Sequence, residues 1–324
     1  LNENGAIKIT KAVGQSVVAI KLGTVEFAGK DVEFKEHVSS NNFKFSGDSV
    51  KEVIFTKNAD IAESDFENNS NAIHTVVVPE VDDIIFAGKF KEGSNQIKFQ
   101  IQEGKTIVNS SFGGAIFTTK DNRKGKLELN TGAEIYAAGE AQNLLDSITF
   151  VENNTKITNG AYAAEIKVAD SQSAFIGGHV ASDAPLALEA NSTLSLLDGV
   201  SLESAVSGET SSSVKFLGGG AVKDDIGSEG RLLKSVKFSD DNKLSGLSLG
   251  GNIYSSYVCF AAGEVKLDKE VKVSSSGMEF NGANIDLRAH VLNPSSKGGI
   301  TFKGKNKIKT AMSSDTSDNK IVAG

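Results

Sequence analysis

Apolar and polar residues alternate along this chain in very short bursts. Such alternation is typical of half-buried β-strands, whereas amphipathic helices place apolar residues three and four positions apart. The two segments closest to a helical pattern, 60–66 and 140–145, are both short. We therefore expect an all-β chain, with clear strand signals at 6–9, 17–22, 127–129, 194–196 and 265–267.

The strand signals recur at a nearly constant spacing in the C-terminal half. Five triplets of the form apolar-x-Phe begin 22, 22, 20 and 22 residues apart, at 214–216, 236–238, 258–260, 278–280 and 300–302. A second series follows in step at 247–249, 265–267 and 285–287, and a third at 253–254, 271–273 and 290–292. Three short strands in a repeat of about twenty residues describe one triangular coil of a solenoid.

The repeat predicts a right-handed parallel β-helix, in which each strand pairs with its equivalent one coil away. Residues facing inward then stack on their counterparts, so we expect an internal ladder of Phe216, Phe238, Phe260, Phe280 and Phe302. The alternative is an antiparallel sandwich or barrel. Asn-Gly and Asp-Gly dipeptides, which favour hairpins, occur at 4–5, 159–160, 198–199 and 281–282, so the prediction of a β-helix depends on the repeat spacing.

The spacing divides the chain into two regions. Residues 151–324 carry the regular coils, whereas in residues 1–150 the Phe triplets persist at irregular intervals. We expect insertions or a cap in the first region, a projecting loop at 63–71, and a strand at 76–78 that Pro79 ends.

Composition and charge exclude some classes of partner. The net charge is −7 and the basic residues are mostly Lys, so the basic field of a nucleic-acid binder is missing. The single Cys rules out an internal disulfide, and no apolar stretch reaches the roughly 18 residues of a membrane span. Because the chain begins with Leu and shows no signal peptide, we expect a processed segment of a longer protein.

Acidic pairs are the first candidates for catalysis, because enzymes that cut glycans use pairs of carboxylates. The pairs are Asp82-Asp83, Asp224-Asp225 and Asp240-Asp241. Neighbouring residues of a strand point to opposite faces, and these pairs lie in polar, turn-like surroundings. We interpret them as solvated turns and predict no catalytic residues and no enzymatic activity.

Histidines are the second group of candidates. His179 follows Gly177-Gly178, as in some pectin-cleaving sites, but no Arg-x-Lys element lies near it, so we interpret it as a turn residue. The positions of the histidines, at His37, His74, His179 and His290, lack the spacing of metal ligands, and no calcium-binding loop is present. We expect neither a metal nor a cofactor.

Two further features could have a role on the outer surface. Cys259 is the middle, outward residue of its triplet, and no activating group is evident, so we expect an unreactive thiol. Lys303, Lys305, Lys307 and Lys309 share one face if their segment is a strand. Such a row either attracts an anionic glycan or is a solvated face that discourages edge-to-edge pairing.

The stretch from Ser235-Val236-Lys237-Phe238 through Gly250-Gly251-Asn252-Ile253-Tyr254-Ser255 to Val265-Lys266-Leu267 resembles passenger repeats of rickettsial surface cell antigen autotransporters. The outer membrane protein B type is the nearest of these. Chlamydial polymorphic membrane proteins are a second resemblance. Their Gly-Gly-Ala motif is matched at 113–116 and 219–222, and their Phe-x-x-Asn motif at 66–69 and 150–153.

Either resemblance implies a passenger that crosses the outer membrane through a C-terminal translocator barrel of the parent protein and folds outside as a β-helix. It implies a bacterial cell-surface or secreted location, a role as an adhesin or surface antigen, and a host cell-surface protein or glycan as partner. It transfers no catalytic residues. Two alternatives stay open, a glycan-cleaving β-helix enzyme and a purely structural spacer.

Overall fold

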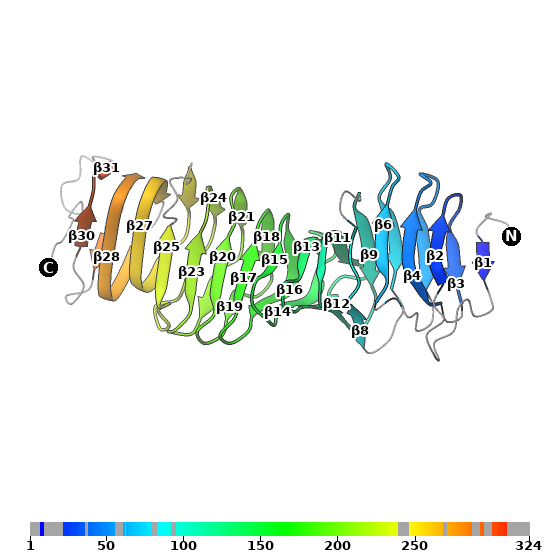
Figure 1. Cartoon of the computed structure of the whole chain (residues 1–324). Helices are drawn as coiled ribbons and strands as arrows, with labels where there is room; N and C mark the ends of the chain where they lie inside the picture. Colours follow the sequence, from blue (N-terminus) through cyan, green and yellow to red (C-terminus); the bar gives the residue numbers. More distant parts are fainter. Residues whose placement is uncertain are drawn as a thin grey trace. The chain divides into compact units, whose positions relative to one another are not determined.

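The computed structural model describes residues 7–9, 22–35, 38–55, 61, 63–78, 83–91, 95–238, 246–267, 271–286, 292–294 and 300–309. These residues contain strands and turns and no helix, and the parallel strands wind into a β-helix of about 12 turns (Figure 1). The prediction of a parallel β-helix is therefore confirmed. The segments 60–66 and 140–145 form no helix where they are described.

The chain divides into two compact units, unit 1 (Leu1–Ile157 and Tyr162–Ala164) and unit 2 (Thr158–Ala161 and Glu165–Gly324). The predicted contrast between residues 1–150 and 151–324 stays a prediction. Strand β16 (Ala161–Val168) contributes residues to both units. The strands of unit 1 are β1 (Ile7–Ile9), β2 (Leu22–Phe27), β3 (Val32–Phe34), β4 (Ser40–Phe45), β5 (Glu52–Phe55), β6 (Asp65–Asn68), β7 (His74–Val77), β8 (Asp83–Phe86), β9 (Ile97–Ile101), β10 (Lys105–Val108), β11 (Ser111–Thr119), β12 (Lys124–Leu129), β13 (Glu134–Ala138), β14 (Leu145–Phe150) and β15 (Thr155–Ile157).

Unit 2 is built from three ladders of parallel strands, and each strand pairs with its equivalent one coil further on. Its strands are β17 (Ser173–Ile176), β18 (His179–Ser182), β19 (Leu186–Leu188), β20 (Thr193–Leu196), β21 (Val200–Leu202), β22 (Val206–Gly208), β23 (Ser213–Phe216), β24 (Gly220–Val222), β25 (Ser235–Phe238), β26 (Leu247–Leu249), β27 (Ile253–Leu267), β28 (Val271–Asp286), β29 (Leu292–Pro294), β30 (Ile300–Lys303) and β31 (Lys307–Lys309).

The first ladder of unit 2, β17–β20–β23–β25–β27–β28–β30, carries the predicted stack of Phe residues. Successive ring centroids lie 4.9, 4.8, 5.2 and 5.2 Å apart from Phe216 to Phe302, and each pair of rings is stacked. Phe216, Phe238, Phe260 and Phe280 are fully buried. Phe302, at the last of these strands, is 50% exposed, so the ladder is internal for the first four rings only.

The second predicted series is confirmed, because Leu247 pairs with Val265 and Val265 with Ile285. The third series is wrong by two residues at its last member. Val271 pairs with Leu292, whereas the sequence pattern aligned it with His290, which lies outside the described residues. A shift of two positions along a strand keeps every side chain on the same face, so the apolar pattern alone did not reveal it.

Asp198-Gly199, one of the dipeptides that favour hairpins, serves here as a corner between ladders, and Asn4-Gly5 lies outside the described residues. Asp198 and Gly199 lie between β20 and β21, where Gly199 has φ 75° and the Asp198 carboxylate accepts a hydrogen bond from the Gly219 backbone N–H at 2.8 Å. The contact joins this corner to the equivalent corner of the next coil. Antiparallel bridges in the described residues are isolated and close tight turns, as between Ser228 and Arg231. The antiparallel alternative is therefore excluded.

Unit 1 has the same parallel winding, with ladders β1–β3–β5–β7–β9–β11–β13, β2–β4–β6 and β8–β10–β12–β14. Its core differs because Phe rings from different ladders meet edge to face. Phe66 and Phe99 lie 5.0 Å apart at 86°, and Phe86 lies 5.6 Å from Phe112 at 77°. Edge-to-face contacts of this kind stabilise a mixed aromatic core.

The prediction of a projecting loop at 63–71 is wrong. This segment contains β6, whose Phe66 and Asn68 side chains are 0% and 1% exposed. The Asn68 amide donates hydrogen bonds to the carbonyls of Ala72 at 2.8 Å and Gln96 at 3.0 Å. A buried asparagine with satisfied hydrogen bonds made an interior segment resemble a surface loop. The strand expected at 76–78 is β7, which ends at Val77; Pro79 lies outside the described residues.

Candidate functional site

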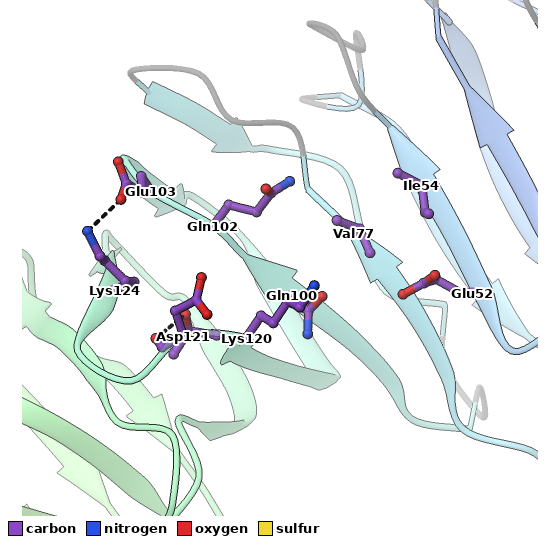
Figure 2. A pocket seen from close by; sticks show the side chains of 10 residues that line it. Glu52, Ile54, Val77, Gln100, Gln102, Glu103, Lys120, Asp121 and Lys124 are labelled. Atoms are coloured by element: carbon purple, nitrogen blue, oxygen red, sulfur yellow. Dashed lines mark hydrogen bonds and ion pairs between the residues drawn. The ribbon is translucent and has the colours of Figure 1, made fainter.

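A hollow of about 280 Å³ opens on the outer surface of unit 1 (Figure 2). Its side chains come from β5, β7 and β9, from the end of β11 and the start of β12, and from the turns that follow β9 and β11. They combine amides, carboxylates, ammonium groups and two aliphatic residues. The lining residues are Glu52, Ile54, Val77, Gln100, Gln102, Glu103, Thr119, Lys120, Asp121 and Lys124.

Parallel pairing builds the floor of this hollow. Ile54, Val77 and Gln100 occupy equivalent positions on β5, β7 and β9, because Ile54 pairs with Val77 and Val77 pairs with Gln100. Their neighbours on either side in the strands, such as Val76 and Phe99, are fully buried. Strand alternation therefore turns the row of three outward, away from the core.

Three contacts hold the rim in place. The Gln102 amide donates a hydrogen bond to the Val78 carbonyl at 3.0 Å, and the Thr119 hydroxyl donates one to the Asp121 carbonyl at 2.9 Å. The Lys124 ammonium forms an ion pair with the Glu103 carboxylate, drawn as a dashed line in Figure 2, and the two groups lie 2.5 Å apart. This ion pair lowers the pKa of Glu103 and raises the pKa of Lys124.

Other polar groups of the hollow are open to a ligand. Among the described residues, the Gln100 amide, the Glu52 carboxylate and the Lys120 ammonium form no hydrogen bond or ion pair. Gln100 and Glu52 are half-buried and Lys120 is exposed. The hollow thus presents both donors and acceptors of hydrogen bonds at one place.

The acidic pairs singled out by sequence do not form this site. Asp83 is exposed but begins strand β8, so its assignment to a turn is wrong, and its carboxylate lies 3.9 Å from the Lys105 ammonium. Asp82 lies outside the described residues. Asp224 and Asp225 lie in a turn, as predicted, and the Asp225 carboxylate accepts hydrogen bonds from the backbone and amide of Asn252. Asp240 and Asp241 lie outside the described residues.

The histidines are dispersed. His179 begins β18, so its assignment to a turn is wrong, and its Nε2 lies 3.4 Å from a carboxylate oxygen of Glu203. His74 is fully buried in unit 1. His37 and His290 lie outside the described residues. Within the part of the chain that the structure describes, no group of three or more His, Cys, Asp or Glu residues is arranged to hold a metal ion.

Cys259 lies in an outer row of unit 2, between Lys237 and Glu279 on the neighbouring strands. Its exposed fraction is only 8%. The Tyr257 hydroxyl donates a hydrogen bond to the Glu279 carboxylate at 3.1 Å. Burial and a hydrogen bond with Cys259 raise the pKa of Tyr257. The thiol is therefore part of a packed polar cluster.

The prediction of a single row of lysines is wrong. Gly304, with φ 69°, breaks the segment, so Lys303 ends β30, Lys305 lies in the turn, and Lys307 and Lys309 belong to β31. The Lys303 ammonium lies 3.0 Å from the Glu279 carboxylate and that of Lys309 lies 3.5 Å from Asp286. Two of the four charges are thus neutralised by the preceding coil.

Comparisons with protein-family models, with curated proteins and with solved structures found no match to this chain. The search for membrane-spanning helices found none of sufficient length and apolar character in the described residues.

Sequence reasoning missed the hollow. Its open polar groups lie at Glu52, Gln100 and Lys120, which are separated by 48 and 20 residues and form no motif. The sequence signal that could have found it is the repeat, because residues one coil apart in the sequence become neighbours in the structure. In residues 1–150 the irregular spacing concealed which residues those are.

Proposed function

We propose that this chain is an extracellular passenger segment of a bacterial autotransporter, which acts as an adhesin or surface antigen in contact with host cells. The observation that carries the proposal is the parallel β-helix, whose interior is closed by stacked side chains and whose outer faces are left for binding. The resemblance of the 235–267 region to rickettsial surface cell antigens supports the same assignment.

The proposal includes a place and a set of partners. The segment acts at the bacterial cell surface or after secretion, and a C-terminal translocator barrel in the parent protein exports it. Its partner is a host cell-surface protein or glycan. The polar hollow of unit 1 supports a binding role, since it gathers hydrogen-bonding groups that have no partner among the described residues.

The test is the binding of the purified, fluorescently labelled segment to cultured host cells. The proposal predicts saturable binding that the unlabelled segment displaces and that the heat-unfolded segment does not show. Absence of saturable binding on every relevant cell type would contradict it. If deletion of the segment from the parent protein leaves host attachment intact, the spacer alternative is favoured.

A second candidate function is cleavage of a glycan. The observation in its favour is that three carboxylates, of Glu52, Glu103 and Asp121, line the same hollow. Glycosidases use two carboxyl groups about 5–9.5 Å apart, one of which donates a proton to the leaving oxygen. Glu103 is held as a carboxylate by Lys124, which leaves Glu52 and Asp121 for these roles.

The cleavage candidate is tested by incubating the segment with neutral and acidic polysaccharides and measuring new reducing ends. Cleavage by the wild-type segment that Glu52→Gln and Asp121→Asn abolish would establish it. Without release of reducing ends from any polysaccharide, the binding role stands alone.

A further inference from the structure

We propose that the hollow of unit 1 binds one ring of a neutral sugar, such as the terminal residue of an uncharged glycan. This inference rests on the proposed function, because it names the chemical class of ligand that the segment contacts. It is carried by the charge, the hydrogen-bonding groups, the aliphatic surface and the size of the hollow.

The charge of the hollow disfavours an anionic ligand. Three carboxylates and two ammonium groups line it, and the Glu103–Lys124 ion pair neutralises one of each. The remaining groups, Glu52, Asp121 and Lys120, leave one negative charge in excess. A sialylated, sulfated or phosphorylated glycan would therefore be repelled, whereas a neutral ring would not.

The open groups match vicinal hydroxyls. A sugar hydroxyl both donates and accepts hydrogen bonds. The open side chains of the hollow together offer donors and acceptors to match it. The Gln100 amide offers two N–H donors and a carbonyl acceptor, the Glu52 carboxylate accepts, and the Lys120 ammonium donates. Gln100 and Glu52 are half-buried, so a hydrogen bond to either is partly shielded from competing water.

The floor and the size suit a single ring. The half-buried Ile54 side chain adds aliphatic surface on which the C–H face of a sugar can rest, and Val77, which is 8% exposed, adds a small part beside it. The volume of about 280 Å³ is close to the lower end of the range of small-ligand pockets, about 300–1,000 Å³, which suits one ring better than a larger oligosaccharide.

A peptide strand fits this place less well. Peptides that bind β-proteins in extended form pair with the exposed edge of a sheet. The strands below the hollow are interior members of their ladder, since β7 pairs with both β5 and β9, and β9 pairs with both β7 and β11. Their backbone groups are thus already used, and only side chains are left for recognition.

The test measures affinity for uncharged and charged sugars on the full segment. We expect titration calorimetry to detect binding of at least one neutral hexose or N-acetylhexosamine, and none of glucuronic acid, sialic acid or a sulfated hexose. Glu52→Gln and Gln100→Leu should each raise the dissociation constant about tenfold, as the loss of one charge-assisted or partly shielded hydrogen bond does. Glu165→Gln and Gln142→Leu are matched controls, because both side chains are exposed and lie outside the hollow, and they should leave affinity unchanged.

Two results would overturn the inference: binding of charged but not neutral sugars, and no binding of any sugar while the segment still binds host cells. In the second case the adhesin proposal stands and the hollow is not its sugar site. Conversely, a segment that binds a neutral sugar through Glu52 and Gln100 but attaches to no host cell supports the hollow and contradicts the adhesin proposal.

Discussion

At the scale of single residues, the aromatic rings of unit 2 contribute most clearly to stability. Phe238 lies between Phe216 at 4.9 Å and Phe260 at 4.8 Å, and the latter pair is inclined by only 1°. Each such ring removes on the order of 150–250 Å² of surface from water and gains additional stabilisation from its stacked neighbours. A gap in the stack cannot be closed without moving paired strands, so a cavity would persist.

Phe238→Ala is therefore expected to lower the free energy of unfolding by about 3–5 kcal/mol. Phe302→Ala is the matched control, since Phe302 is 50% exposed and stacks on a single ring, Phe280. Its loss should be clearly smaller. Urea denaturation followed by circular dichroism measures both, and equal losses would contradict an internal ladder.

A buried histidine in unit 1 provides a second test at this scale. The Nδ1 of His74 lies 2.5 Å from the Val50 carbonyl oxygen, and because a carbonyl only accepts, Nδ1 carries the proton. Its Nε2 lies 2.5 Å from the Ser70 hydroxyl, and its ring stacks on Phe45 at 4.8 Å. The ring thus combines packing with two hydrogen bonds.

His74→Phe retains the aromatic contact and removes both hydrogen bonds, which should cost about 1–3 kcal/mol of stability. The control is His179→Phe, where the side chain is half-buried on the outer surface, and where a change within about 0.5 kcal/mol is expected. Thermal unfolding of the two variants beside the wild-type segment compares them. If His74→Phe leaves the thermal stability unchanged, packing alone accounts for the contribution of this ring.

At the scale of strands and coils, ion pairs join several neighbouring coils. Among the pairs in which a Glu is followed one coil later by its Lys, four lower the pKa of the Glu, at Glu67, Glu103, Glu203 and Glu279. Lys91, Lys124, Lys223 and Lys303 are the respective partners. Because the Lys partners are exposed and the Glu side chains lie at the surface, each pair contributes little on its own.

Together the four carboxyls predict a dependence of stability on acid. A carboxyl with a lowered folded-state pKa stabilises the fold above its unfolded value, near 4.5, and loses that contribution as pH falls through the folded value. The melting temperature should therefore fall as pH is lowered from about 5. Replacement of all four Glu residues by Gln should flatten the curve, and an unchanged slope would mean that other groups govern acid unfolding.

The sequence predicted strands best where the repeat is regular. The Phe triplets from 214 onward gave the register of one ladder, because a large ring at every coil leaves a unique alignment. The third ladder, with smaller residues, was aligned two positions away from the pairing of Val271 with Leu292. The buried Asn68 concealed β6, since an internal hydrogen-bonded amide has the same sequence signal as a surface turn.

The candidate site was beyond sequence reasoning for a different reason. Glu52 and Gln100 line one hollow because three coils place β5 and β9 on either side of β7. In the sequence, a single Glu and a single Gln that lie 48 residues apart look like any other exposed polar residues. Only the register between coils identifies them as neighbours, and the irregular spacing of unit 1 did not give that register in advance.

At the scale of the whole molecule, parallel winding within each unit determines both the core and the outer surface. Winding places residues about one coil apart in the sequence side by side and buries a continuous aromatic and aliphatic interior. The same winding creates outer rows of side chains, of which the floor of the hollow is one. An antiparallel arrangement of the same strands would dismantle both the Phe ladder and the hollow.

The most direct measurement is a disulfide cross-link in a Cys259→Ser background. Lys215 and Lys237 are exposed partners on β23 and β25, and parallel neighbours lie about 4.8 Å apart, within the range of a disulfide. A hairpin of β23 and β24 would instead bring Lys215 opposite Ala221, which in the β-helix pairs with Ser201 and Ser248.

Under mild oxidation, we predict that the double variant Lys215→Cys with Lys237→Cys forms the disulfide and that the double variant Lys215→Cys with Ala221→Cys does not. The opposite result, read by mass spectrometry of the digested protein, would contradict the β-helix.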